Sequence, residues 1–254
     1  MEQTSKVGHY NFFTEAFHVD LTGRLFMGIL GNQLLNVAGM HAKDRGFGMA
    51  YLNENHYTWV LSRLVIDMDR MPVQYEPYSI DTWVENVYKL FTDRNFSIAG
   101  KDGDVIGYAR SIWAMIDMSS RKPADLLALH GGNITDYIET SRECPIDKPC
   151  RIKVTSAEPV RQLQMHYCDI DINGHVNSIK YIEHILDLFP IERFKSERVR
   201  RLEIAYVTES YCGDVLSFFC DEANDSEYNV EVRKNVETDG KGEVVVRAKV
   251  VFSK

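Results

Sequence analysis

Cysteine is scarce and irregularly placed in this chain of 254 residues. The cysteines are odd in number, form no C-x-x-C pair and show no regular spacing: Cys144, Cys150, Cys168, Cys212 and Cys220. Disulfide frameworks and zinc sites need paired or regularly spaced cysteines, so the sequence predicts neither. We therefore expect no disulfide, no metal and a reducing, cytoplasmic location.

Long hydrophobic runs and excess positive charge are also missing. No uncharged apolar run approaches the roughly 18 residues that a bilayer-spanning helix needs, so we expect no membrane insertion. The opening MEQTSKVGHYNFF has the pattern of neither a signal peptide nor a transit peptide, and we expect no targeting segment. The net charge of -8 disfavours nucleic acid as a partner, because phosphate binding needs a positive surface.

The chain does have the composition of a globular protein, with 44% apolar and 26% charged residues. Apolar residues between Leu25 and His41 recur at helical spacing and fill much of the remainder, which predicts a helix buried nearly all round. The pair Asp102-Gly103 is typical of a hairpin turn. Strand-like segments follow the helix at 59–68, 78–87, 95–99 and 105–117.

The second half repeats this order of elements. A shorter helix between Val176 and Phe189 ends before Pro190, and a turn around Asp239-Gly240 joins the last two strands. The predicted strands of this half are 201–207, 215–221, 229–235 and 244–252.

The two halves also match residue by residue. DLTGRL at 20–25 aligns with DINGHV at 171–176, and RLVI at 63–66 aligns with RLEI at 201–204. The two offsets differ because the first copy carries the additional stretch GFGMAYLNENHY. The sequence therefore predicts an α+β protein with two tandem units, each a long helix against an antiparallel sheet. The predicted boundaries are 1–130 for the N-terminal unit, 131–160 for a linker and 161–254 for the C-terminal unit.

Only the second copy places an acid, an amide and an imidazole in one loop. Asp171, Asn173 and His175 stand there, whereas the first copy has Thr22 and Arg24 at the last two positions. An imidazole can move protons near neutral pH, and an amide can donate to a carbonyl oxygen. These residues are therefore candidates for a catalytic site.

Simpler interpretations of the same loop exist. DINGHVN has the composition of a turn, and Asn177 could cap the helix that follows. The run D-x-D-x-N-G from Asp169 resembles the start of a calcium-binding EF-hand loop. However, Lys180 stands where the bidentate glutamate belongs, and no helix pattern precedes the run. Calcium binding is therefore not expected.

Glu209 is a further carboxylate that appears only in the second copy. It aligns with Met71 and lies just past a predicted strand, although a surface loop is the ordinary place for a glutamate. Ser210, Cys168 and Cys212 are candidate nucleophiles. Without a neighbouring base they are better interpreted as a loop serine and small buried thiols.

Several segments resemble the acyl-acyl carrier protein thioesterases of plant plastids and bacteria, over nearly the whole chain. The most specific are the Asp-x-Asn-x-His-Val-Asn signature and the Trp-Val-x-x-Arg segment. The matching segments are FMGILGNQLLNVAGMHA, WVLSRLVIDMDRMP, IDTWVENV, SIWAMIDMSSRKP, MHYCDIDINGHVNSIKYIEHILDLFP and LEIAYVTESYCGDVLSF. The resemblance implies a double hotdog fold and thioester hydrolysis in fatty acid synthesis. We expect no cofactor.

The resemblance also implies that catalysis depends on Asp171, Asn173, His175 and Glu209. Plant members carry a cysteine directly after this glutamate, sometimes assigned as a nucleophile, whereas here the residue is Ser210. A thiol-based mechanism is therefore disfavoured for this chain.

Hydrolysis of a thioester chiefly needs a positioned water, a base and an oxyanion site. We expect Glu209 to be the base, aided by His175, which could also protonate the departing thiolate. Asn173, together with backbone N–H groups near Gly174 and Val176, would hold the thioester oxygen.

Alternatives to this assignment stay open. Asp171, which we expect to orient the loop through its hydrogen bonds, could exchange roles with Glu209, or a carboxylate could attack directly. The chain could instead hydrolyse acyl-CoA on the same fold, or bind acyl groups without catalysis.

A basic cluster just after the second helix is the candidate surface for acyl carrier protein. Long-range repulsion between two acidic proteins is tolerable only where a local positive patch meets the acidic face of the partner. The candidate docking residues are Arg193, Lys195 and Arg198, although charge runs on surfaces are usually only solvated. A second copy of the chain, in a homodimer, is a further candidate partner.

Overall fold

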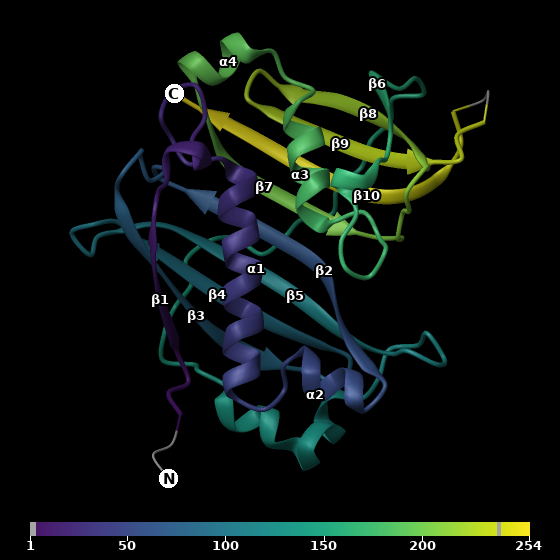
Figure 1. The fold of residues 1–254 in the computed structure, drawn as a ribbon. Helices are drawn as coiled ribbons and strands as arrows, with labels where there is room; N and C mark the ends of the chain where they lie inside the picture. Colours follow the sequence, from purple (N-terminus) through teal and green to yellow (C-terminus); the bar gives the residue numbers. More distant parts are fainter. Residues whose placement is uncertain (1–3, 238–239) are drawn as a thin grey trace. The chain divides into compact units, whose positions relative to one another are not determined.

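The structure, a computed structural model, describes residues 4–237 and 240–254, apart from the side chains of 130–132. The chain divides into two compact units (Figure 1). Unit 1 consists of the residues up to 25 and of 30–148, and unit 2 consists of 26–29 and 149–254. Unit 1 therefore includes part of the segment that the sequence assigns to the linker.

Unit 1 is an antiparallel sheet with the long helix α1 across one face (Figure 1). Its described strands follow the order β1-β3-β4-β5-β2. The strands are β1 (Gly8–Phe13), β2 (Tyr57–Met68), β3 (Pro77–Val87), β4 (Phe91–Ala99) and β5 (Val105–Asp117). The helices are α1 (Met27–Asp44), which belongs to unit 1 from Leu30 on, α2 (Met49–Glu54) and the 3-10 helices η1 (Ala16–His18) and η2 (Leu126–Tyr137).

Unit 2 repeats this arrangement, with the strand order β6-β8-β9-β10-β7 and antiparallel pairing throughout. Its strands are β6 (Arg161–Gln164), β7 (Arg198–Tyr206), β8 (Val215–Asn224), β9 (Glu227–Lys234) and β10 (Glu243–Ser253). Its helices are α3 (Ser178–Leu186), α4 (Ile191–Ser196) and the 3-10 helix η3 (Tyr167–Asp169). The two units thus share one strand order, which confirms the predicted α+β class with two tandem hotdog units.

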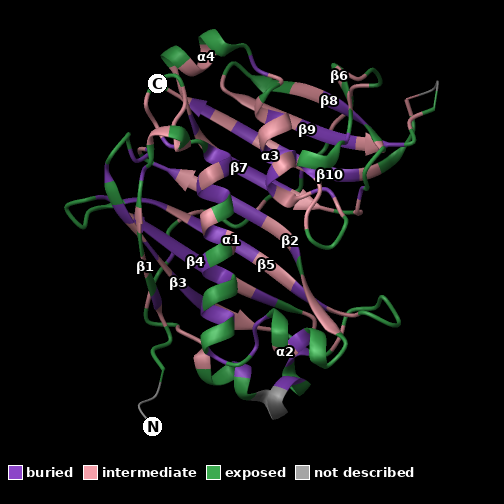
Figure 2. Cartoon of the chain, in the orientation of Figure 1, coloured by how far each residue is buried: buried purple, intermediate pink, exposed green. Residues whose placement is uncertain are grey.

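Helix α1 is buried on one face only, so the prediction of burial nearly all round is wrong. Leu30, Leu34 and Val37 are completely buried, whereas Asn36 and Met40 are exposed (Figure 2). A sheet covers one side of a helix, and the apolar stripe that it needs recurs every three to four residues. The additional apolar residues of α1 therefore do not all belong to the core.

The hairpin at Asp102-Gly103 is confirmed, since Gly103 has a φ of 83° and β4 pairs with β5. Asp239 of the second predicted turn lies outside the described residues. Strands β1 and β6 are not predicted by the sequence. The four residues of β6 read RQLQ, and one apolar residue gives too little alternation to reveal a strand.

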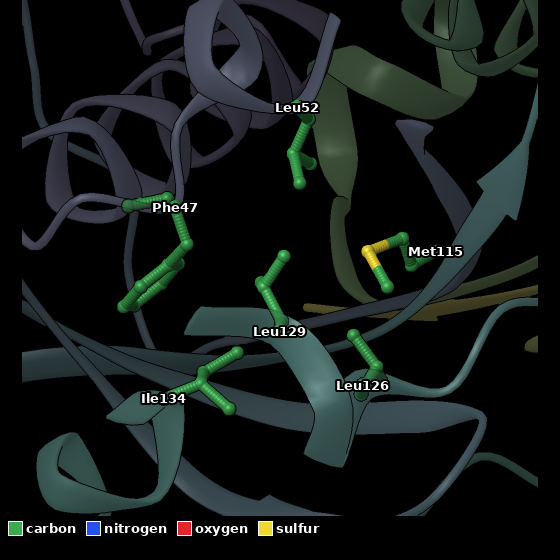
Figure 3. Packing of buried hydrophobic residues seen from close by; sticks show 7 residues of the cluster. Phe47, Leu52, Met115, Leu126, Leu129 and Ile134 are labelled. Carbon is green, nitrogen blue, oxygen red and sulfur yellow. The ribbon is translucent and has the colours of Figure 1, made fainter. Parts of the chain in front are cut away.

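The stretch that lengthens the first copy packs into a hydrophobic cluster of unit 1 (Figure 3). Leu52 of α2 and Met115 of β5 are buried there beside residues of η2. The buried members are Ala42, Phe47, Leu52, Met115, Leu126, Leu129 and Ile134. Because Ile134 belongs to this cluster, η2 is part of unit 1 rather than of the linker.

Candidate active site

The loops 20–25 and 171–176 have the same backbone hydrogen bonds in the two units. In unit 2, the Asp171 N–H donates to the His175 carbonyl over 2.8 Å, and the Gly174 N–H donates to the Asp171 carbonyl over 3.0 Å. The corresponding distances in unit 1 are 2.7 and 2.9 Å. Gly174 and its counterpart Gly23 have φ values of 80° and 77°, a conformation that favours glycine. The sequence repeat is therefore also a repeat of local structure.

The Asp171 carboxylate closes its loop. Its Oδ1 accepts the N–H groups of Asn173 (2.8 Å) and His175 (3.1 Å). The aspartate of loop 20–25 accepts the two equivalent N–H groups at 2.7 and 3.2 Å. Asp171 thus orients the loop as predicted, by bonds that belong to the architecture of both units.

Each loop is held against the segment that follows the unit's first long strand. In unit 2, the Val176 N–H donates to the Ser210 carbonyl (2.8 Å), and His175 forms an antiparallel bridge with Tyr211. Unit 1 has the same backbone contacts at the equivalent positions, with a hydrogen bond of 2.8 Å. This register places Glu209 where unit 1 has a methionine, as the sequence alignment predicts.

The side chains of His175, Glu209 and Tyr211 meet on this framework. His175 Nε2 lies 3.5 Å from Glu209 Oε2, and the Tyr211 hydroxyl donates to the same oxygen over 3.3 Å. The Tyr211 ring stands edge-on to the imidazole, with 5.2 Å between ring centroids and an interplanar angle of 77°. The His175 and Glu209 side chains are 26% and 34% exposed. Two of the predicted residues thus lie close together and are both partly exposed.

Two contacts of Glu209 involve residues that the sequence did not single out. Lys234, at the end of β9, donates from Nζ to the Glu209 carbonyl oxygen over 2.7 Å and lies 3.5 Å from the Glu243 carboxylate. Tyr211 is the second residue. It stands where the first copy has Val73, so a change of side-chain type in the repeat was the available signal.

Asn173 is exposed, and its amide makes no hydrogen bond to the described part of the chain. The backbone N–H groups of Gly174 and Val176, predicted as oxyanion donors, already donate to the carbonyls of Asp171 and Ser210. The Asn173 amide is thus a side-chain donor of this loop that stays available for a ligand.

The candidate nucleophiles differ in accessibility. Ser210 is completely buried, so its hydroxyl is not presented to a substrate in this conformation. Cys168 and Cys212 are exposed free thiols, in contrast to the predicted small buried ones.

No group of three or more His, Cys, Asp or Glu in the described residues could hold a metal ion. No described helix is long and apolar enough to cross a membrane.

A second pair of carboxylate and imidazole anchors the start of the loop to α3. Asp169 Oδ1 lies 3.0 Å from His184 Nε2, and both side chains are largely buried. Asp169 also accepts the His166 N–H on Oδ2 (2.8 Å) and the Asn177 N–H on its carbonyl (2.7 Å). Asn177 Oδ1 accepts the Ile179 N–H (2.9 Å), which confirms the predicted helix cap.

We expect Asp169→Asn to lower the free energy of unfolding at neutral pH by about 1–3 kcal/mol. Burial raises the pKa of Asp169, but the His166 N–H and His184 outweigh it, and the net pKa is lowered. A carboxyl with a lowered folded-state pKa stabilises the protein above its unfolded pKa of about 3.9, and this is lost as pH falls through the folded value. Urea unfolding from neutral to acid pH should therefore show the two proteins converging below about pH 4.

The exposed Glu192→Gln is the control for this series, and it should unfold like the native protein at every pH. The ionic role of Asp169 would be contradicted if the free energies of unfolding of Asp169→Asn and the native protein differed by the same amount down to acid pH.

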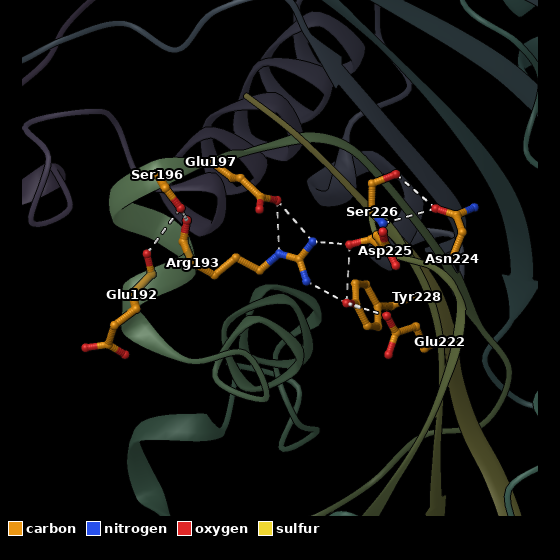
Figure 4. A network of polar contacts seen from close by, with 9 residues as sticks. All are labelled: Glu192, Arg193, Ser196, Glu197, Glu222, Asn224, Asp225, Ser226 and Tyr228. Atoms are coloured by element: carbon orange, nitrogen blue, oxygen red, sulfur yellow. Dashed lines mark hydrogen bonds and ion pairs between the residues drawn. The ribbon is translucent and has the colours of Figure 1, made fainter.

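Arg193, the first candidate docking residue, lies in an internal network (Figure 4). Its guanidinium pairs with Glu197 at 3.0 Å and donates to the Tyr228 hydroxyl at 2.5 Å and to the Asp225 carbonyl. It also lies 4.3 Å from the centroid of the Phe252 ring. Arg193 therefore fastens α4 to β9 and β10, and its charge is largely used within the unit.

The other two candidate docking residues differ in exposure, since Lys195 is exposed and Arg198 is half-buried. The Lys195 side chain is 55% exposed, with Nζ 3.8 Å from the Glu192 carboxylate. Arg198 donates from Nη1 to the carbonyl of Lys254 over 2.7 Å. Of the three, Lys195 presents the most accessible charge.

Comparison with known proteins gives matches over both units. Residues 6–128 match the family model of the acyl-ACP thioesterase N-terminal domain, and residues 152–254 match that of the C-terminal domain. An acyl-ACP thioesterase structure from Bacteroides thetaiotaomicron VPI-5482 is 64% identical, with a TM-score of 0.91 and 98% of each chain covered. The 12:0-ACP thioesterase from Umbellularia californica shares the fold at 18% identity, with a TM-score of 0.84 and 100% and 99% coverage.

A plant relative matches in sequence as well. The chloroplastic palmitoyl-acyl carrier protein thioesterase of Gossypium hirsutum is 25% identical over 222 residues, which cover 83% of this chain. The match covers 53% of the plant protein, so the chain spans about half the length of this relative.

Proposed function

The chain belongs to the acyl-ACP thioesterase family, and from this we propose that it hydrolyses fatty acyl-acyl carrier protein to free fatty acid and carrier protein. The observation that carries the proposal is the approach of His175 to Glu209, 3.5 Å apart, on the loop framework of unit 2. Unit 1 has Arg24 and Met71 at these positions, so the framework alone does not account for the pair.

The site contains the groups that hydrolysis of an activated acyl bond needs. In the proposed reaction, Glu209 accepts a proton from water as the water oxygen bonds to the thioester carbon. The Asn173 amide donates to the carbonyl oxygen as it becomes an oxyanion. When the carbon–sulfur bond breaks, the proton that Glu209 took from water is transferred through His175 to the leaving thiolate, so that both side chains return to their starting state. Asp171 keeps Asn173 and His175 in register through their N–H groups.

Free thiol release from matched acyl carrier protein and CoA thioesters tests this function. The purified protein would be incubated with both substrate types over a series of acyl chain lengths. We expect enzyme-dependent release with a higher kcat/KM for the carrier-protein substrates. A higher kcat/KM for CoA thioesters would favour the acyl-CoA thioesterase alternative, and no release from either by folded protein would favour a non-catalytic acyl-binding protein.

We further propose that acyl carrier protein docks beside α4. Lys195→Glu should raise KM for acyl carrier protein substrates by about 2- to 5-fold at low salt and less at high salt, because exposed charges are screened by ions. KM for a small thioester should stay unchanged. Lys89→Glu in unit 1 is the matched control, since Lys89 is also an exposed lysine (72%) with a carboxylate 3.9 Å away. Equal effects of both reversals would remove α4 from the docking surface.

A further inference from the structure

The turn that carries Tyr211 has an equivalent hydrogen bond from a backbone N–H to a side-chain carboxylate in both units. The Tyr211 N–H donates to Asp214 Oδ2 at 2.9 Å, and the Val73 N–H of unit 1 donates to Glu76 Oε2 at 2.9 Å. The turn therefore needs an acid three residues later, but it does not need an aromatic side chain at the position of Tyr211.

Tyr211 contacts both members of the proposed acid–base pair. Its hydroxyl donates to Glu209 Oε2, the same oxygen that approaches His175 Nε2, and its ring packs edge-on against the imidazole. An ionised carboxylate only accepts hydrogen bonds, so a fixed donor selects among the rotamers of a partly exposed glutamate. An aromatic edge likewise limits the orientations of the imidazole.

We infer that Tyr211 is a positioning residue of this site, which keeps the Glu209 carboxylate turned toward His175. The inference rests on the proposed thioesterase function and adds a residue to it. Tyr211 need not touch the substrate, because it acts through the fraction of molecules in which Glu209 is correctly placed. Acid–base catalysis requires that the reacting side chain be held close to its productive geometry.

The main chain at Glu209 is fixed independently of the Tyr211 hydroxyl. Lys234 Nζ holds the Glu209 carbonyl at 2.7 Å, and the next carbonyl, that of Ser210, accepts the Val176 N–H at 2.8 Å. Removing only the phenolic oxygen should therefore leave the loop in place and release the carboxylate alone. This separation makes Tyr211→Phe a selective test.

We expect Tyr211→Phe to lower kcat and kcat/KM by about 5- to 20-fold with little change in KM, because the lost interaction acts on the chemical step. Tyr211→Leu, which also removes the ring, should lower kcat further. A small thioester substrate excludes effects on carrier-protein docking. Tyr167→Phe, at an exposed tyrosine of η3, is the matched control and should behave as the native protein.

A double-mutant cycle separates positioning from a general structural role. If Tyr211 acts through Glu209, Tyr211→Phe should cause no further loss in a Glu209→Gln background, whereas independent effects would multiply. Native kcat in Tyr211→Phe, or an undiminished loss in the Glu209→Gln background, would overturn the inference. Both outcomes differ from failure of the proposed function, in which the native protein itself releases no thiol.

Discussion

Replacement of His175 by alanine is expected to lower kcat by about 10² or more, the size of effect typical of a lost general acid–base group. The fold should persist, because the loop uses only the backbone of His175: its N–H donates to Asp171 Oδ1 and its carbonyl accepts the Asp171 N–H. Steady-state hydrolysis of an acyl carrier protein thioester gives kcat, and thermal unfolding checks the fold.

Arg24→Ala supplies the matched control, since Arg24 occupies the same position of the same backbone loop in unit 1. Its side chain donates to the Thr22 hydroxyl over 2.6 Å, a local contact of the loop. We expect this variant to keep kcat within about 2- to 3-fold of the native value, as for a surface change away from the chemistry. Near-native turnover in His175→Ala with unchanged melting, or an equal loss in Arg24→Ala, would contradict the assignment of chemistry to unit 2.

Much of the fold could be read from the sequence because its signals are local and periodic. The predicted range 105–117 agrees with β5, since alternation over a long strand marks both of its ends. The equivalence of Glu209 with Met71 was predicted from the motif that RLVI at 63–66 shares with RLEI at 201–204. Because a strand rarely accommodates an insertion, the alignment stays in register from this motif to Glu209 and Met71. Edge strands such as β6 were missed because four residues with one apolar side chain give no period to detect.

The availability of backbone donors was harder to predict. Free N–H groups occur in the first turn of a helix, and the sequence suggested that Gly174 and Val176 lie near such a turn. Helix α3 begins only at Ser178, so both residues precede it and their N–H groups close the loop instead. Where a helix starts depends on its cap, here Asn177, and the shift of a few residues decides which donors remain for a ligand.

Contacts between distant segments explain the other omissions. Lys234 reaches Glu209 from the end of β9, and no local pattern marks a lysine that will meet a carbonyl 25 residues away. Arg193 shows the converse. Its positive charge suggested a docking residue, but Glu197, Tyr228 and Phe252 take up the guanidinium once the chain is folded. The sequence shows which residues are charged, but the tertiary structure decides whether such a side chain is exposed or is paired with other residues.

Glu209→Gln is expected to lower kcat by about 10² to 10⁴, because the amide cannot accept the proton of the attacking water. The substitution keeps the size of the side chain. The Tyr211 hydroxyl can still donate to the oxygen of the glutamine amide, and the Lys234 ammonium can still donate to the main-chain carbonyl of residue 209. Melting should therefore stay near native. Single-turnover measurements with the enzyme in saturating excess over the thioester would place the loss in the chemical step rather than in product release.

The same prediction separates water from an enzyme nucleophile. Because water is the nucleophile in the proposed reaction, Ser210→Ala, Cys168→Ala and Cys212→Ala should each retain turnover when Glu209→Gln does not. Ser210 is in addition completely buried. Intact-mass spectrometry of the native enzyme during a single turnover should show no acyl adduct. An adduct on Ser210 or on either cysteine would contradict activation of water by Glu209, and an adduct on Glu209 itself would show direct attack by the carboxylate. Glu209→Gln is expected to lose activity whether Glu209 acts as a base or as a nucleophile. The mass of the transient enzyme species therefore distinguishes these two roles.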